Sequence, residues 1–317
     1  MRVILGFDIG GTKCAVITAE ISENEIRITA KEVISTDLKL KPREMIDRLI
    51  ALADKICAGK KPERVGISCG GPLDPEKGVI LGPPNLPGWD FVPIADILKE
   101  RYKVPVRLQN DANACAVAEW KFGAGRGFKN VVFLTFGTGM GAGLILDGKL
   151  YCGTNGNAGE VGHIRLKESG PVGYGKAGSF EGFCSGGGIA RLGYAMAIEK
   201  AQQGETPSYF KPGMEKEDVT AKSIAEAANK GDKTALLVYR ICGEQLGQGL
   251  SVLIDILNPE RIIIGSIFAR SGNLLRQSAF EVIKREALTS SANCCEVVPA
   301  ELGEQIGDYA AIATALL

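Results

Sequence analysis

One local design occurs twice in the sequence. Residues Val3–Ile17 consist of two apolar runs on either side of the loop Asp8–Lys13, and Val131–Leu146 repeats this order around the loop Gly137–Gly141. Apolar runs of this length that are bounded by glycine predict strands. A strand–loop–strand unit that returns after roughly 130 residues predicts two duplicated domains that face each other. The sequence therefore favours an α/β chain built from two related halves.

Other segments fit the same plan. Apolar residues at helical spacing, Asp147–Gly148 as a hairpin signal and a polar stretch at Ser22–Glu25 predict further helices and turns. The predicted strands are Ile26–Val33, Arg64–Ser68, Val104–Leu108 and Arg261–Gly265, and the predicted helices are Pro42–Ile56, Ala112–Lys121, Thr220–Ala228, Thr234–Ile256 and Asp308–Leu317.

Composition excludes several classes of protein. Lysine plus arginine equal aspartate plus glutamate at 37 each, so no basic field collects nucleic acid. No apolar run approaches the ~18 residues that cross a bilayer, and Asp8 interrupts the N-terminal run too early for a secretory signal. The nine cysteines are odd in number and scattered, which favours free thiols. We expect a cytoplasmic protein with no membrane or nucleic-acid partner.

Glycine is the unusual component, with 41 residues of 317, roughly twice the usual share of ~7%. In the first loop, backbone amides of Gly10, Gly11 and Thr12 can reach phosphate oxygens because glycine has no Cβ to block the approach. Asp8 suits a water-mediated contact with Mg²⁺, which keeps several waters in protein sites. An ordinary hairpin turn is the alternative. The second loop favours the phosphate interpretation because two such loops can hold one polyphosphate.

A second group of polar residues suggests a reaction. Asn110 and Asp111 precede a predicted helix, where they would serve as simple caps. Asp111 could instead accept the proton of an attacking hydroxyl, a role that a kinase assigns to a carboxylate of roughly normal acidity. Glu160, His163 and Glu181 could bind sugar hydroxyls, the alternative being a solvated Glu beside a core histidine. His163 is the only histidine in the chain.

At this point the sequence resembles the ROK family of sugar kinases and related repressors, within the actin-like ATPase superfamily. The likeness covers nearly the whole chain through several motifs in order. These are Asp8–Lys13 and Thr135–Gly143 as two phosphate motifs, Asn85–Trp89 as a substrate segment, Asn110–Asn113 as the catalytic segment, and Glu160–His163 with Glu181 as sugar contacts.

The resemblance implies a fold and a set of roles. The fold would be two ribonuclease-H-like α/β domains flanking a central cleft, residues 1–119 with 303–317 and residues 120–302. Asp111 would be the general base, and ATP and Mg²⁺ the cofactors, with Asp8 holding Mg²⁺ through water. The sugar would meet Asn85, Asn110, Glu160, His163 and Glu181, and the nucleotide would meet Asp8, Gly10, Gly11, Thr12, Lys13, Gly137, Thr138, Gly139 and Gly265.

The sequence departs from the family pattern at three places. The three cysteines that would bind a structural zinc are replaced by Val172, Tyr174 and Ser179, and one histidine cannot hold zinc, so we expect no zinc. Packing of Tyr174 and Phe180 would fix the segment instead. In Gly265-Ser266-Ile267 the isoleucine adds bulk beside the expected adenosine. No DNA-binding segment precedes the strand at Val3, so we expect no direct DNA binding.

The expected activity is phosphorylation of a hexose, with glucose at the 6-hydroxyl first. Kinases for fructose, mannose, allose or an N-acetylhexosamine remain open, as does a catalytically weak sugar-sensing ROK protein. The expected partner is a small sugar, and the family resemblance implies a homodimer.

Overall fold

The computed structural model describes residues 2–22 and 26–317, and the chain divides into two compact units. The first comprises Met1–Gly127, Gly143–Ala158 and Glu301–Leu317, and the second comprises Phe128–Ala142 and Gly159–Ala300. The domain limits expected at residues 119 and 302 stay a prediction. Most of the turn predicted at Ser22–Glu25 lies outside the described residues.

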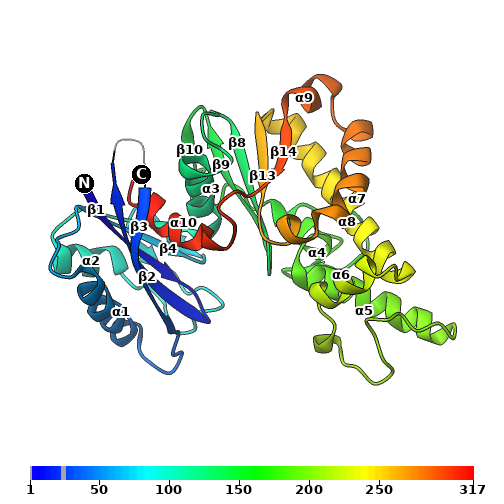
Figure 1. The fold of residues 1–317 in the computed structure, drawn as a ribbon, viewed down its shortest axis with the longest axis horizontal. Coiled ribbons are helices and arrows are strands. Elements are labelled where there is room, and N and C mark those ends of the chain that lie inside the picture. The colour runs from blue at the N-terminus through cyan, green and yellow to red at the C-terminus, as the bar shows by residue number, and fades with distance from the viewer. Residues whose placement is uncertain (1, 23–25) are drawn as a thin grey trace. The chain divides into compact units, whose positions relative to one another are not determined.

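Figure 1 labels most of the helices and strands of the described residues along the chain. The strands are β1 (Arg2–Ile9), β2 (Lys13–Ile21), β3 (Ile26–Ser35), β4 (Arg64–Cys69), β5 (Leu73–Asp74), β6 (Val79–Ile80), β7 (Val106–Asn110), β8 (Val131–Phe136), β9 (Met140–Leu146), β10 (Lys149–Tyr151), β11 (Val172–Gly173), β12 (Lys176–Ala177), β13 (Arg261–Ile264) and β14 (Glu296–Pro299). The helices are α1 (Pro42–Cys57), α2 (Ile94–Tyr102), α3 (Asp111–Phe122), α4 (Phe180–Phe183), α5 (Gly186–Gln202), α6 (Ala221–Asn229), α7 (Lys233–Leu257), α8 (Ile267–Glu286), α9 (Thr289–Cys294) and α10 (Ile306–Thr314), with 3₁₀ turns η1 (Val161–His163), η2 (Lys216–Asp218) and η3 (Gly303–Gln305).

The two larger sheets share one strand order. The first runs β3-β2-β1-β4-β7 and the second β10-β9-β8-β13-β14, which is the same order when strands are counted along the chain. In the first sheet β2 is antiparallel to its neighbours, whereas β1, β4 and β7 are parallel to one another. In the second, β9 and β10 form a hairpin closed at Asp147 and Gly148, both with left-handed φ, and β13 is parallel to β8 and β14. The predicted α/β class with a repeated strand–loop–strand unit is confirmed.

Helices cover both faces of the first sheet. Side chains alternate along β1, so that Leu5, Phe7 and Ile9 belong to one core cluster and Ile4 to another. The first cluster includes residues of α1 and α2, and the second includes Ala311 and Ile312 of α10, which therefore lies on the opposite face (Figure 1). This places the chain's C-terminal helix beneath β1, β2 and β4.

Two glycines allow α10 to lie unusually close to the sheet. A Cβ on Gly6 would stand 2.9 Å from Cβ of Ala311, and one on Gly66 would meet the Ala311 carbonyl oxygen and stand 2.5 Å from the Ala315 nitrogen. Neither contact is possible for real atoms at these separations. The close approach brings the first turn of α10, with Gly307 and Asp308, to the end of β1.

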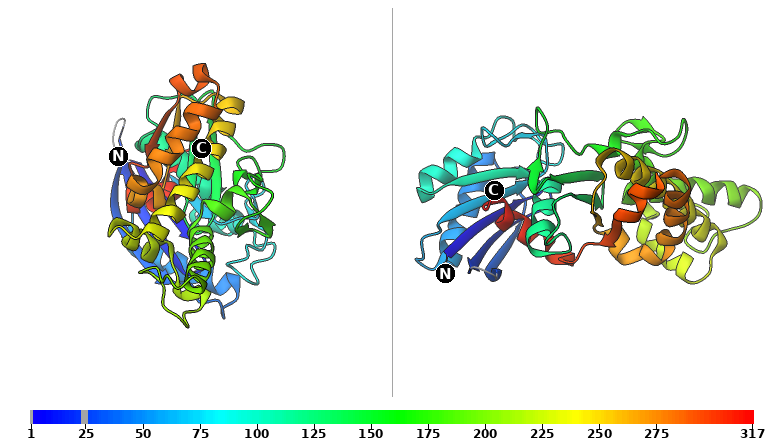
Figure 2. Two further views of the ribbon diagram at one scale, coloured as in Figure 1. Left: turned by 90° about the vertical axis from the view of Figure 1, so that its right-hand side faces the viewer. Right: turned by 90° about the horizontal axis from the view of Figure 1, so that it is seen from above.

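The second unit is richer in helix than the sequence predicted. The helices α7 and α8 pack along one another, as Figures 1 and 2 show from three sides. The apolar periodicity predicted α6 and α7 to within one residue at each end. It did not predict α2, α5 or α8. Among the described residues no helix combines the length and apolar character needed to cross a membrane.

The close contact of α10 with the sheet yields a prediction. Gly66→Ala forces a methyl group into the backbone of α10, so we expect the free energy of unfolding to fall by about 1–3 kcal/mol or more. Urea denaturation measures the change. Gly272→Ala in α8 is the matched control, because its Cβ would meet only the flexible Arg276 side chain at 3.3 Å, and helix propensity predicts a neutral or slightly stabilising effect. Equal stability of the two variants would contradict the packing account.

Candidate functional site

The carboxyl ends of the parallel strands β1, β4 and β7 meet at one edge of the first sheet. Ile9 pairs with Cys69, and Cys69 pairs with Asn110, so the three strands end in register. Asp8 lies one residue before this line and Asp111 one residue after it. Open α/β sheets bind ligands at this edge.

Asp8 is strongly affected by its surroundings. Burial is the main cause that raises the pKa of Asp8 to about 6, followed by repulsion from Asp308 and Asp111, while Lys13 and Lys31 act in the opposite direction. Three carboxyl groups therefore influence one another at this edge of the sheet. They do not form a three-ligand metal site among the described residues, so a Mg²⁺ ion here would be held by one carboxylate and its own waters, and this role of Asp8 stays a prediction.

The first glycine loop is a hairpin connection that leaves backbone amides available. Gly10 donates to the Lys13 carbonyl at 3.2 Å, and the carbonyl of Gly10 accepts from the Thr36 hydroxyl at 2.6 Å. None of the described residues accepts a backbone hydrogen bond from Gly11 or Thr12. The loop is therefore a hairpin turn, the alternative raised for it, and phosphate binding by its free amides stays a prediction.

Asn85 lies directly over this loop. A Cβ on Gly11 would overlap the Asn85 carbonyl oxygen, and a Cβ on Gly70 would stand 3.7 Å from the Asn85 amide group. The structure thus brings the predicted substrate asparagine beside the predicted phosphate loop within the first unit.

Asn110 and Asp111 begin α3, as the capping alternative required. The Asn110 side chain accepts from the Asn113 amide at 2.8 Å, and the Asp111 side chain accepts from the Ala112 amide at 2.8 Å. The Asp111 side chain reaches solvent, yet enough protein surrounds it for desolvation to raise its pKa, while its hydrogen bonds to backbone amides oppose the shift. Asp111 is thus an accessible carboxylate with an increased affinity for protons.

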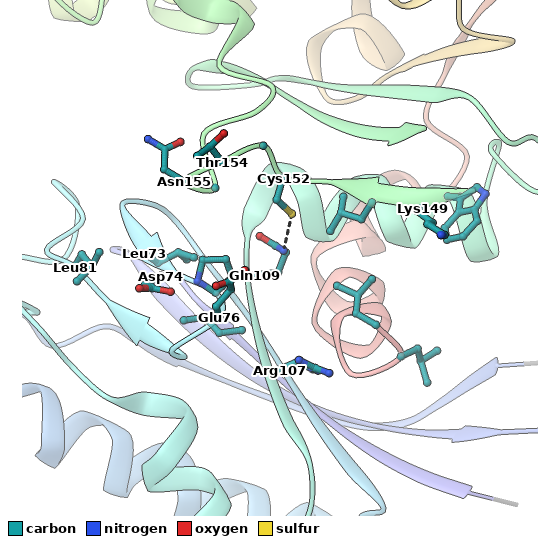
Figure 3. Close-up of a pocket in the computed structure, with 18 of the residues that line it drawn as sticks. Leu73, Asp74, Glu76, Leu81, Arg107, Gln109, Lys149, Cys152, Thr154 and Asn155 are labelled. Carbon is teal, nitrogen blue, oxygen red and sulfur yellow. Dashed lines mark hydrogen bonds between the residues drawn. The ribbon is translucent and has the colours of Figure 1, made fainter. Parts of the chain in front are cut away.

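Gln109 supports this segment from behind. Its side-chain oxygen accepts from the Asn110 amide at 2.8 Å and from the side chain of Asn113 at 3.2 Å, and its NH₂ group donates to the Cys152 thiol at 3.6 Å. Gln109 lines a cavity of about 690 Å³ in the first unit, together with residues such as Arg107 and Asn155 (Figure 3). None of the predicted site residues lines this cavity.

The second unit gathers the other predicted residues around its own glycine loop. Gly137 donates to the Gly139 carbonyl at 3.1 Å and its carbonyl accepts from the Gly186 amide at 2.7 Å. The Glu181 carboxylate accepts from the Met140 amide at 3.1 Å, and a Cβ on Gly139 would stand 2.9 Å from it. Thr138 lies between these two glycines. The structure therefore joins the second loop to Glu181.

Glu160 and His163 bracket the short turn η1 beside this loop. His163 donates its backbone amide to the Glu160 carbonyl at 3.2 Å. A Cβ on Gly162, within the same turn, would stand 3.2 Å from Cβ of Glu181 and overlap the Met140 carbonyl. Glu160, His163 and Glu181 are thus neighbours in the fold although they span 22 residues of sequence.

Gly265 follows β13 in the same unit. Ser266 adopts a left-handed φ of 52°, and its side chain lies 3.5 Å from where a Cβ of Gly137 would stand. Ile267, expected to add bulk beside the adenosine, is 8% exposed and lies near Gly186. Its side chain is therefore largely part of the core.

Sequence reasoning missed two buried acidic residues of the first unit, of which Asp308 lies at the edge of the first sheet. Asp308 is 6% exposed, and its carboxylate lies 2.7 Å from the Lys31 ammonium group, which comes from β3. A lone acidic residue at the start of an apolar terminal helix was the available signal.

Glu119 was missed as well. Its buried carboxylate accepts three backbone amides, from Ala124, Glu301 and Leu302, at 2.9–3.2 Å. It therefore joins the end of α3 to the segment that leads into α10.

The two sheets and the residues at their loops together define the fold class of the protein. Two α/β sheets of one topology each carry a glycine loop between their first two strands, and the first sheet adds an acidic residue at the end of β1 and another at the start of α3. This is the architecture of the actin-like ATPase fold.

The comparisons give the family. The ROK family model matches residues 4–316, and the chain belongs to the ROK family. It is 32% identical over 305 residues to a glucokinase of Thermotoga maritima, covering 96% of this chain and 94% of that one. A crystal structure of a ROK family glucokinase from Streptomyces griseus, in complex with glucose and AMPPNP, superposes with a TM-score of 0.77 at 30% identity and covers 99% of both chains.

The family also contains regulators. The chain is 32% identical over 231 residues to a xylose repressor of Caldicellulosiruptor bescii, covering 70% of this chain and 55% of the repressor.

The raised pKa of Asp8 predicts a pH-dependent stability. The folded protein holds this proton up to about pH 6, whereas the unfolded chain releases it near 3.8. The free energy of unfolding therefore falls as pH rises through this window, by at most about 3 kcal/mol. In Asp8→Asn this fall disappears, so we expect the variant to match the unmodified protein at pH 4 and exceed its stability at pH 7.5.

Urea denaturation at several pH values in EDTA checks this result. Asp96→Asn on α2 removes a side chain that is 68% exposed and serves as the control. Parallel pH profiles for the unmodified protein and Asp8→Asn would contradict the assignment.

Proposed function

We propose that the protein is an ATP-dependent sugar kinase that transfers the terminal phosphoryl group of Mg²⁺-ATP to a hexose. The observation that carries the proposal is the position of Asp8 and Asp111 at the same edge of the first sheet. The loop Asp8–Lys13, whose Gly11 and Thr12 amides are available, lies at this edge. The full-length similarity to glucokinases supports it. Glucose at the 6-hydroxyl is the first candidate substrate.

The residues of the two glycine loops are proposed to bind Mg²⁺-ATP. The amides of Gly11 and Thr12, with Lys13, bind phosphate oxygens. Gly10 has no Cβ and so lets the phosphate come close to the backbone of the loop. The loop Gly137–Gly139 of the second unit binds phosphate as well, and Gly265 lies beside the nucleoside. Bound Mg²⁺ would neutralise phosphate charge, held through water by Asp8.

Sugar hydroxyls are the expected ligands of the remaining residues. Asn85 and Asn110 lie in the first unit, and Glu160, His163 and Glu181 lie in the second. Such side chains orient a hexose by accepting and donating hydrogen bonds. Fructose, mannose, allose and N-acetylhexosamines present the same chemistry and are the alternative substrates.

Asp111 accepts the proton of the attacking hydroxyl. Its raised pKa makes the carboxylate a better proton acceptor than an ordinary aspartate, while its access to solvent leaves room for substrate. In a loose phosphoryl-transfer transition state most of the rate comes from position and charge. Asp111 therefore orients the nucleophile and takes its proton late.

Asp111→Asn tests this role. We expect kcat to fall by about 10²–10⁴-fold, because the amide cannot accept the proton, while the Kd of the sugar measured by calorimetry changes little. Asp96→Asn controls for the loss of one charge. Undiminished turnover in Asp111→Asn would remove Asp111 from the mechanism.

The product identifies the hydroxyl. With glucose and Mg²⁺-ATP, ³¹P NMR of the reaction mixture should show a single sugar phosphate whose phosphorus couples to the two protons on carbon 6. Coupling to a single ring proton would assign the transfer to another hydroxyl.

A further inference from the structure

The segment that would hold zinc in the family pattern is a hydrogen-bonded hairpin in this protein. Strands β11 and β12 pair through Val172 with Ala177 and Gly173 with Lys176. Tyr174 and Gly175 connect them with left-handed φ values of 42° and 76°. Positive φ at both central residues is typical of the tightest hairpin turns.

The side chains of this hairpin do not fit zinc. Val172 offers no donor, and the Ser179 hydroxyl already accepts from the Gly182 amide at 3.0 Å and donates to the Gly173 carbonyl at 3.4 Å. Cys184, the nearest thiol in sequence, donates to the Cys242 carbonyl at 3.5 Å. Within residues 2–22 and 26–317 no three His, Cys, Asp or Glu side chains gather as a metal site. A structural zinc needs four ligands.

The same hairpin contacts the segment that zinc would otherwise fix. The Tyr174 ring meets the His163 ring edge-on, with centroids 5.0 Å apart and an interplanar angle of 78°. The Lys176 ammonium group donates to the His163 carbonyl at 2.7 Å. One side chain thus orients the imidazole and the other fixes the backbone that carries it.

The turn itself accounts for the left-handed backbone of Tyr174, because both central residues of this type of hairpin need positive φ. A tyrosine is uncommon there, since a non-glycine residue with left-handed φ is disfavoured by about 1–2 kcal/mol. The Tyr174 side chain is 73% exposed, so its ring contributes little to the core and is placed instead against the ring of His163.

We propose that Tyr174 and Lys176 are positioning residues that hold His163 toward the substrate without a metal. This inference rests on the proposed function, because it assigns His163 to the sugar. The ring of Tyr174 limits rotation of the imidazole, and Lys176 fixes the turn η1, which Glu160 precedes and His163 ends. Ser179 and Phe180 anchor the other end, through the cap of α4 and through the Phe180 amide, which donates to the Ile164 carbonyl at 2.8 Å.

The lone histidine makes the test direct. The imidazole carbon-bound protons of His163 give the only histidine signals in a ¹H–¹³C spectrum of the whole protein. Tyr174→Ala removes a ring 5.0 Å away and should shift both signals, whereas Tyr174→Phe keeps the ring and should leave them near their original positions. Tyr151→Ala removes another exposed aromatic ring, from β10, and is the control that should shift neither.

Kinetics give a second readout. We expect Tyr174→Ala and Lys176→Met to raise the KM of the sugar by about two- to tenfold, the size of an aromatic edge contact, with kcat nearly unchanged. The conservative variants Tyr174→Phe and Lys176→Arg should keep the KM of the unmodified protein. Unmoved His163 signals in Tyr174→Ala, or an unchanged KM in both alanine and methionine variants, would overturn the proposal.

The zinc content of the purified protein tests whether His163 is held without a metal. We expect less than one zinc per ten chains and no change of Tm in EDTA, and one zinc per chain would overturn the metal-free assignment. If no sugar is phosphorylated, the proposed function fails, and the NMR comparison still decides whether the hairpin positions His163.

Discussion

Burial of the Asp8 carboxyl group beside two further carboxyl groups is the constraint on which the arrangement of the first unit depends. Asp8 carries a pKa near 6 because it is buried beside Asp308 and Asp111. The arrangement requires α10 to lie close beneath the sheet, which Gly6 and Gly66 allow, and it requires Lys31 of β3 to pair with Asp308. A folded protein that keeps such a cluster is less stable than it could be, and the proposed Mg²⁺ would supply the missing positive charge.

The second unit solves a different problem, that of fixing a short turn. Glu160 precedes η1 and His163 ends it, and a turn of three residues is too short to hold its own conformation. Glu181 contacts the second glycine loop from α4, and the β11–β12 hairpin contacts His163 through Tyr174 and Lys176. Side-chain packing and hydrogen bonds connect this hairpin to the turn in the described residues, and the expected absence of zinc stays a prediction.

Sequence reasoning predicted those features that depend on local pattern. The repeated strand–loop–strand unit indicated two sheets of one topology, and apolar periodicity located α1, α6 and α7 because their buried faces recur every three to four residues. It failed for α5, which begins with Gly186, Gly187 and Gly188, residues of poor helix propensity that the fold places there regardless. The pair of Lys31 and Asp308 spans 277 residues, and only the folded chain reveals it. The predicted site residues occupy two groups, one in each unit, and their roles stay predictions.

Release of ADP from Mg²⁺-ATP tests the central claim most directly. The unmodified protein would be assayed with glucose, mannose, fructose, allose, N-acetylglucosamine and N-acetylmannosamine, each against a sugar-free control. A sugar kinase predicts sugar-dependent ADP release, with the highest kcat/KM for glucose. Binding of a sugar without ADP release above the control, across the whole set, would contradict the account and indicate a sugar-sensing protein.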